Sequence, residues 1–188
     1  QMCIRDSIYV EPDLAKILLS KCSEFILKYI RALKETGVDG IIMAEPAAGL
    51  LSNDDATIFS TNYIKPIVEA VQDENFLFVL HNCGNTGHCT QSMIDSGARA
   101  LHFGNQCDIV SALQQVPSDR LVMGNLDPVG IFKSSSPKQV YDETERLLHA
   151  TADFDNFIIS TGCDVPPGVS LENINAFYRA VEIFRNRH

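Results

Sequence analysis

The stretch Asn75–Asn82, "NFLFVLHN", is a run of large apolar residues that ends in polar ones. A short apolar run without polar alternation is typical of a parallel strand that is covered on both faces. Four further stretches show the same pattern, so we expect five strands in all. The other four are expected within residues 40–44, 98–104, 119–128 and 156–167.

Helical patterns alternate with these strands. Residues 13–36 carry apolar side chains at helical spacing, and Gly37 marks the end of that helix. Ser60 or Thr61 is expected to cap a helix that ends near residue 72 and is interrupted by Pro66. The remaining helices are expected within residues 90–97, 108–116, 136–151 and 170–186. This alternation predicts an α/β domain built around a parallel sheet.

Two architectures fit the alternation. A doubly wound open sheet suits a chain of 188 residues. A (β/α)8 barrel needs eight strands and about 250 residues, so five strands would form only a portion of one. The absence of a strand before the first helix favours an N-terminally truncated barrel. Residues 8–188 are expected to form one domain. Residues 1–7, "QMCIRDS", fit no element and are interpreted as a cloning or assembly scar.

The composition excludes several classes of protein. The net charge is −9 and the basic residues are scattered, which argues against nucleic acid or an anionic membrane as a partner. Apolar runs are too short for a membrane span, and the N-terminus does not resemble a secretion signal. We therefore expect a cytoplasmic protein whose six cysteines are reduced rather than joined in disulfides.

Polar residues that could bind a ligand or take part in catalysis follow the predicted strands at their carboxyl ends. In parallel α/β folds this edge of the sheet is where functional sites are built. The residues concerned are Glu45, His81, Cys83, His102, Asn125, Asp127, Cys163 and Asp164.

His81 and Cys83 are separated by one residue, so on an extended strand end their side chains point to the same side. Imidazole and thiolate ligands together suit zinc, and Cys163 follows a later strand at the same edge. Three protein ligands leave one position open, as in a catalytic zinc site. The alternative is that Cys83 is a buried thiol and that His81 bonds a backbone carbonyl.

Three segments together resemble the C-terminal half of the uroporphyrinogen decarboxylase superfamily, and the resemblance runs from about Val38 to the end. They are "LHNCGNT" at 80–86, "GNLDPVGIFKSSSPKQVYDETERLL" at 124–148 and "STGCDVPPGVSLENINAFYRAV" at 160–181. The decarboxylase branch of the superfamily lacks the H-x-C-G-N pattern. The branch of methylcobamide:coenzyme M methyltransferases has it, together with a cysteine in a G-C-x-x-P-P segment. This chain, with "HNCGN" and "GCDVPP", is similar to the methyltransferase branch.

The resemblance implies a TIM-type barrel, here represented by about five βα units, with zinc held by His81, Cys83 and Cys163. The fourth zinc position would take the thiol of a small methyl acceptor as its thiolate. That thiolate would attack the methyl group of a methyl-corrinoid carried by a partner protein, and cobalt would leave as Co(I). The implied cofactors are zinc and the corrinoid, and the implied activity is methylcobamide:thiol methyl transfer.

Four further residues are candidates on the same edge. Glu45 is expected either to act catalytically, by filling the open zinc position or by bonding a zinc ligand, or to be a solvated acid in a loop. Asn85 is expected to act by orienting the zinc loop. Asn125 and Asp127 of "GNLDP" are candidates for binding the cofactor. The segment "HFGNQCDI" at 102–109 departs from the methyltransferase branch, which often has an acidic residue there, so the acceptor thiol is left open.

Two other functions remain as alternatives. The first is a metal-free decarboxylase of the uroporphyrinogen type, although the acidic charge and Cys163 speak against it. The second is a non-catalytic corrinoid-binding or interaction module with a structural zinc held by four protein ligands.

Overall fold

The structure, a computed structural model, describes residues 2–84 and 87–187. Its strands are β1 (Gly40–Ala44), β2 (Leu77–Asn82), β3 (Ala100–Phe103), β4 (Leu121–Leu126) and β5 (Phe157–Thr161). Its α-helices are α1 (Met2–Val10), α2 (Pro12–Glu35), α3 (Asn53–Ala56), α4 (Asn62–Val71), α5 (Thr90–Asp95), α6 (Ile109–Gln115), α7 (Pro137–Ala150) and α8 (Leu171–Arg187). Short helical turns η1 (Ala48–Leu50), η2 (Thr57–Thr61), η3 (Gly87–Cys89) and η4 (Pro128–Lys133) complete the elements. No helix in this described part has both the length and the apolar composition that crossing a bilayer requires.

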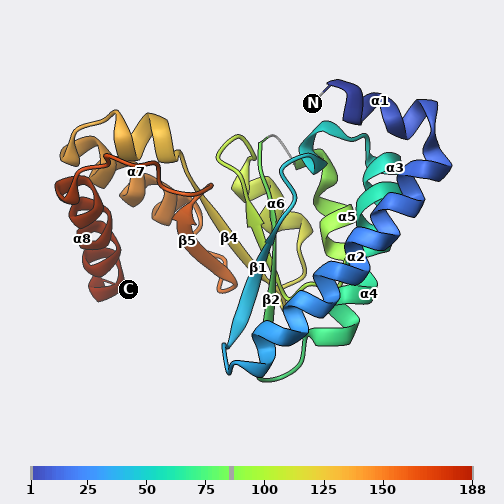
Figure 1. Cartoon of the computed structure of the whole chain (residues 1–188). Coiled ribbons are helices and arrows are strands. Elements are labelled where there is room, and N and C mark those ends of the chain that lie inside the picture. The colour runs from blue at the N-terminus through green and yellow to red at the C-terminus, as the bar shows by residue number, and fades with distance from the viewer. Residues whose placement is uncertain (1, 85–86, 188) are drawn as a thin grey trace.

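The five strands form one parallel sheet in the order β1-β2-β3-β4-β5 (Figure 1). Each strand therefore pairs only with its neighbours in the sequence. A doubly wound sheet reverses its strand order at a switch point, whereas a (β/α)8 barrel adds its strands in sequence. The order thus confirms the barrel-type architecture with five βα units.

The core lies between one face of the sheet and the helices that cover it. Phe78, Leu80, Leu101 and Phe103 of β2 and β3 are at most 1% exposed and pack in one apolar cluster with residues of α4 and α5. Burial of large apolar side chains is the main favourable term in folding, at roughly 1.5–3 kcal/mol each. This cluster fixes the strands whose carboxyl ends carry the candidate site.

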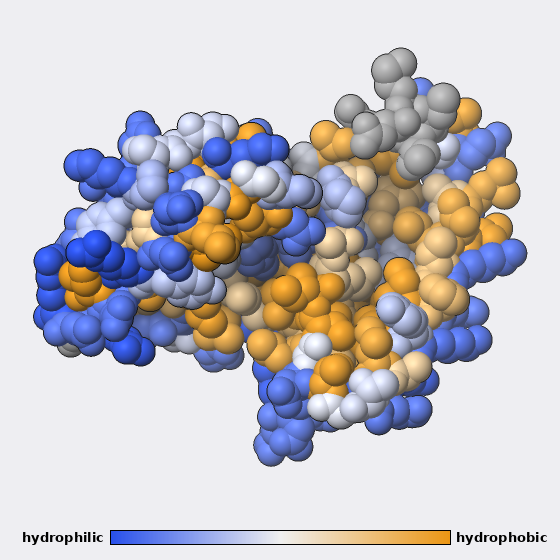
Figure 2. Space-filling view, turned by 60° about the vertical axis from the view of Figure 1, so that its left-hand side comes forward, coloured by the Kyte–Doolittle hydropathy of each residue, from blue (hydrophilic) through white to orange (hydrophobic). Residues whose placement is uncertain are grey.

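Exposed apolar side chains include residues of β1 and α2. On the edge strand β1, Ile41 and Met43 pack on the core, whereas Ile42 between them is 64% exposed. On α2 the apolar side chains recur at helical spacing as predicted, but most of them are exposed, including Leu14, Leu18, Phe25 and Tyr29. Figure 2 shows apolar surface in the middle of the molecule and on its right-hand side, beyond the hydrophilic surface on the left.

Two details differ from the sequence prediction. Residues 1–7 were expected to fit no element, but from Met2 onward they belong to α1; their origin as a scar stays a prediction. The helical segment before β2 begins earlier than expected, because Ser52 and not Ser60 or Thr61 caps it by accepting a bond from the Asp55 N–H. A widened turn, η2, then precedes Pro66, whose missing N–H removes one bond from the helix.

Candidate metal centre

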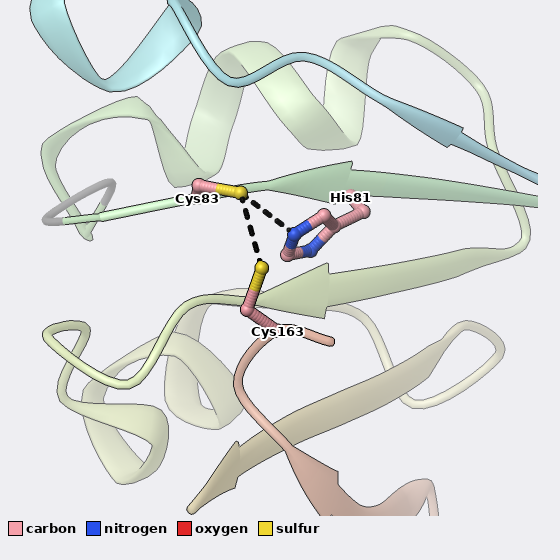
Figure 3. Close-up of side chains that lie close together, drawn as sticks. All are labelled: His81, Cys83 and Cys163. Carbon is pink, nitrogen blue, oxygen red and sulfur yellow. Dashed lines mark hydrogen bonds between the residues drawn. The ribbon is translucent and has the colours of Figure 1, made fainter. Parts of the chain in front are cut away.

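The three residues predicted to bind metal meet at the carboxyl edge of the sheet (Figure 3). His81 lies at the end of β2, Cys83 directly follows that strand, and Cys163 follows β5. The Nε2 atom of His81 is 2.9 Å from the Cys83 sulfur, which is 3.7 Å from the Cys163 sulfur. One potential ligand atom from each residue lies within 4.8 Å of the others. The fold therefore joins two segments that are far apart in the sequence.

This donor set fits zinc. Two thiolates at about 2.3 Å from a tetrahedral zinc ion lie about 3.8 Å apart, which is close to the 3.7 Å between the two cysteine sulfurs. An imidazole nitrogen and a sulfur around the same ion lie about 3.5 Å apart. The His81–Cys83 distance of 2.9 Å is shorter because the ring nitrogen and the thiol are in direct hydrogen-bond contact. Only a small opening of this pair is needed to admit the ion.

Glycines allow the loops around the centre to approach one another closely. A Cβ on Gly104, after β3, would lie 2.6 Å from the Gly84 nitrogen in the loop that follows Cys83. A Cβ on Gly162, beside Cys163, would overlap the backbone of Asn105. No larger residue, acidic or other, fits at position 104 without moving the loop that carries Cys83.

Burial favours the uncharged forms of His81 and Cys83. It lowers the pKa of the His81 imidazole. Burial, followed by the hydrogen bond with Cys163, raises the pKa of the Cys83 thiol to about 11. At neutral pH His81 is therefore a neutral imidazole and Cys83 a protonated thiol, which is consistent with the hydrogen bond between them.

His102 and Ser160 lie beside the three candidate ligands. The sequence analysis placed His102 at this edge without assigning it a role and did not single out Ser160. His102 is the partner of His81 in the β2–β3 register, and the two rings meet edge to face with centroids 4.5 Å apart. The Nε2 atom of His102 is 2.9 Å from the Ser160 hydroxyl on β5. Burial and the adjacent His81 lower the pKa of His102 to about 4. The sequence feature that points to His102 is its place at the end of an apolar strand, which it shares with His81.

Glu45 lies directly after β1, and its N–H donates to the His81 carbonyl at 2.9 Å. Its carboxylate, however, accepts a hydrogen bond from the Ser60 hydroxyl at 2.9 Å. Burial raises the pKa of Glu45 to about 7 despite this bond, which acts to lower it. Within the described residues Glu45 is not part of the metal-binding group, so its predicted catalytic role stays a prediction.

Asn125 and Asp127 hold loops in place. The Asn125 amide donates to the carbonyls of Gly104 and Cys107 at 3.0 and 2.7 Å. Asp127 caps η4 by accepting bonds from the N–H groups of Val129 and Gly130, both at 2.8 Å. Their predicted binding of the cofactor stays a prediction, and Asn85 lies outside the described residues.

Comparison with known proteins identifies the family. The sequence pattern of the uroporphyrinogen decarboxylase (URO-D) family matches residues 2–184. The chain belongs to this family. Its curated relatives include both methyltransferases and decarboxylases, so the family membership alone leaves the reaction open.

Among these relatives, the methylcobamide:CoM methyltransferase MtbA of Methanosarcina mazei is 26% identical over 181 residues, which are 95% of this chain and 52% of that protein. MtbA of Methanosarcina acetivorans is 28% identical over 182 residues, 96% of this chain and 51% of that protein. The uroporphyrinogen decarboxylase of Serratia proteamaculans is 26% identical over 182 residues, 95% of this chain and 51% of that protein. The chain thus spans about half the length of the curated relatives it matches.

A solved structure confirms the fold. A methyltransferase from Methanosarcina mazei superposes with a TM-score of 0.86 at 23% sequence identity. The match covers 97% of this chain and 53% of that one. The five βα units therefore have the arrangement of a portion of a larger protein of this family, as expected for part of a TIM-type barrel.

Proposed function

We propose that the chain carries the metal centre of a zinc-dependent methyltransferase that moves a methyl group from a methyl-corrinoid protein to a small thiol. One observation supports this proposal above the others: His81, Cys83 and Cys163 bring one nitrogen and two sulfur ligands within 4.8 Å of one another. Three ligands with one free position are typical of catalytic zinc rather than structural zinc.

Each ligand residue has a distinct part in this function. His81 and Cys83 present their ligand atoms from one strand end, and Cys163 closes the group from β5. Zinc held there would lower the pKa of an acceptor thiol so that it is a thiolate at neutral pH. The methyl group would then pass from cobalt to sulfur: a C–S bond would form, the Co–C bond would break, and its electron pair would stay on cobalt as Co(I).

The decarboxylase alternative requires no metal, and its relatives are about as similar to the chain as the methyltransferases are. The clustered cysteines favour the methyltransferase, because decarboxylation gives Cys83 and Cys163 no task. The structural-zinc alternative requires a fourth protein ligand. In residues 2–84 and 87–187 the group contains three.

The first test is the zinc content of the purified chain and of its Cys163→Ser variant, measured by elemental analysis. We expect about one zinc ion per wild-type chain and its loss in the variant. The Cys22→Ser variant is the matched control, since Cys22 is exposed on α2, away from the centre.

X-ray absorption at the zinc edge, before and after addition of coenzyme M, then tests the free coordination position of the zinc ion. We expect one more sulfur ligand there after the addition. Absence of zinc from a folded wild-type chain would overturn the proposal.

A further inference from the structure

We propose that Ser160 and His102 form a directed hydrogen-bond relay that holds the proton of His81 on Nδ1, so that the Nε2 lone pair faces the metal position. His102 and Ser160 are thereby positioning residues. The tautomer of His81 is a property of the metal-free chain. Its role in metal binding rests on the proposed function.

The first step of the relay is at His81. Its Nδ1 atom is 2.6 Å from Nδ1 of His102 and 3.3 Å from the backbone carbonyl oxygen of His102. A carbonyl oxygen only accepts hydrogen bonds. The proton must therefore be on Nδ1 of His81, because a lone pair there would face the lone pairs of the carbonyl oxygen.

The second step is at His102. When its Nδ1 accepts the bond from His81, the neutral ring carries its own proton on Nε2. That atom is 2.9 Å from the Ser160 hydroxyl oxygen, which accepts the bond. The Ser160 hydroxyl in turn donates to the backbone carbonyl of Thr161 at 3.1 Å. The Thr161 carbonyl can only accept a hydrogen bond. It therefore sets one direction for the series, in which His81 donates to His102, His102 to Ser160, and Ser160 to Thr161.

The consequence appears at the metal position. With its proton on Nδ1, His81 presents an unprotonated Nε2 to Cys83 at 2.9 Å, as a metal ligand requires. The relay ends at Thr161, two residues before Cys163, so it also connects the strand ends that supply the two cysteines. Hydrogen bonds to the second nitrogen of a metal-binding histidine commonly fix its tautomer and its orientation.

The direct test is nuclear magnetic resonance on the metal-free chain with 15N-labelled histidine. Long-range 1H–15N spectra distinguish the two tautomers, and substitution of each of the five histidines assigns the signals. At pH 7 we expect Nδ1–H for His81 and Nε2–H for His102.

The Ser160→Ala variant should lower the ratio of Nδ1–H to Nε2–H in His81 by about 2- to 10-fold, the effect of one net hydrogen bond. The control Ser134→Ala, at an exposed serine in the turn before α7, should leave it unchanged. Nε2–H as the main form of wild-type His81 would overturn the relay.

A second readout is zinc affinity, measured by competition with a chromophoric chelator. We expect His102→Leu to weaken zinc binding by about 10- to 100-fold. His102→Asn, whose amide oxygen can accept in place of Nδ1, should recover most of that loss. Folded variants that both bind zinc as tightly as wild type would overturn the relay's role in positioning. If wild type binds no zinc but shows the expected tautomers, the proposed function fails and the relay stands.

Discussion

The sulfur atoms of Cys83 and Cys163 lie 3.7 Å apart, although 80 residues separate the two cysteines in the sequence. A disulfide bond needs a distance of about 2.05 Å, so a modest movement of the loops would allow one to form. We expect diamide, a two-electron oxidant of thiols, to join these cysteines in the metal-free chain, and zinc to prevent the reaction. Peptide mapping by mass spectrometry would detect the bond as a loss of two hydrogen atoms.

The Cys163→Ser variant controls for other pairings, because the remaining cysteines should not give the same cross-linked peptide. Equal oxidation of Cys83 with and without zinc would contradict the shared metal centre.

Zinc binding should depend strongly on pH. The pKa of Cys83 is raised to about 11, so its thiol is protonated at neutral pH and must release the proton on binding metal. Removal of protons from solution favours the bound form. Affinity should therefore rise by about 10-fold per pH unit for each proton released, and by about 100-fold for one proton between pH 6 and pH 8. Chelator competition at several pH values measures the slope, and an affinity independent of pH would refute this assignment.

Glu45→Gln should stabilise the chain at alkaline pH. The ordinary pKa of a glutamate carboxyl is 4.5, and burial raises the pKa of Glu45 in the folded state to about 7. Between these pH values the folded state keeps a proton that the unfolded state has lost, so the free energy of unfolding falls as pH rises and levels off above about pH 7. Glutamine cannot ionise and avoids this loss. At pH 8 we expect a gain on the order of 1–2 kcal/mol, after discounting for partial exposure, and little difference at pH 4.

Urea denaturation with a chelator present measures this effect on the metal-free chain. A variant less stable than wild type at pH 8 would show that the ionised carboxylate has a favourable partner.

Asp127→Ala should reduce stability without removing zinc. Its carboxylate caps η4 through two bonds of 2.8 Å, and loss of a helix cap costs about 1 kcal/mol. Asp127→Asn should cost less, because asparagine is also a good capping residue. Thermal unfolding and zinc analysis of both variants check the prediction. Loss of zinc from a variant of unchanged stability would instead favour a role of Asp127 at the metal centre.

Much of the fold was predictable because its signals are local. The strand Gly40–Ala44 was found with its observed bounds, since a short apolar run next to glycine has few other interpretations. The sequence also predicts Ser136 as the cap of α7, and the structure confirms this cap and adds a capping box with Gln139. The grouping of His81 with Cys163 followed from parallel topology, which brings the carboxyl ends of all strands to one edge.

Other features depend on contacts that a sequence does not display. The pairing of His81 with His102 requires the strand register, and the reach of His102 to Ser160 requires the curvature of the sheet. The spacing of apolar residues on α2 predicted a helix correctly but not how much of its apolar face would be covered. Likewise, the loop contacts of Asn125 depend on the neighbouring carbonyls of Gly104 and Cys107, which its own position in the sequence does not display.

The strict strand order also has a consequence for how the chain folds. Every pair of strands in the sheet is formed by adjacent units, so the sheet can grow by adding one unit after another at low cost in chain entropy. The candidate metal centre is different, because it joins Cys83, directly after β2, to Cys163 in the loop after β5. It comes into existence only when the last unit has docked. Under the proposed function, zinc uptake would therefore mark the completion of folding rather than its nucleation. The rate of zinc capture during refolding would then report when β5 joins the sheet.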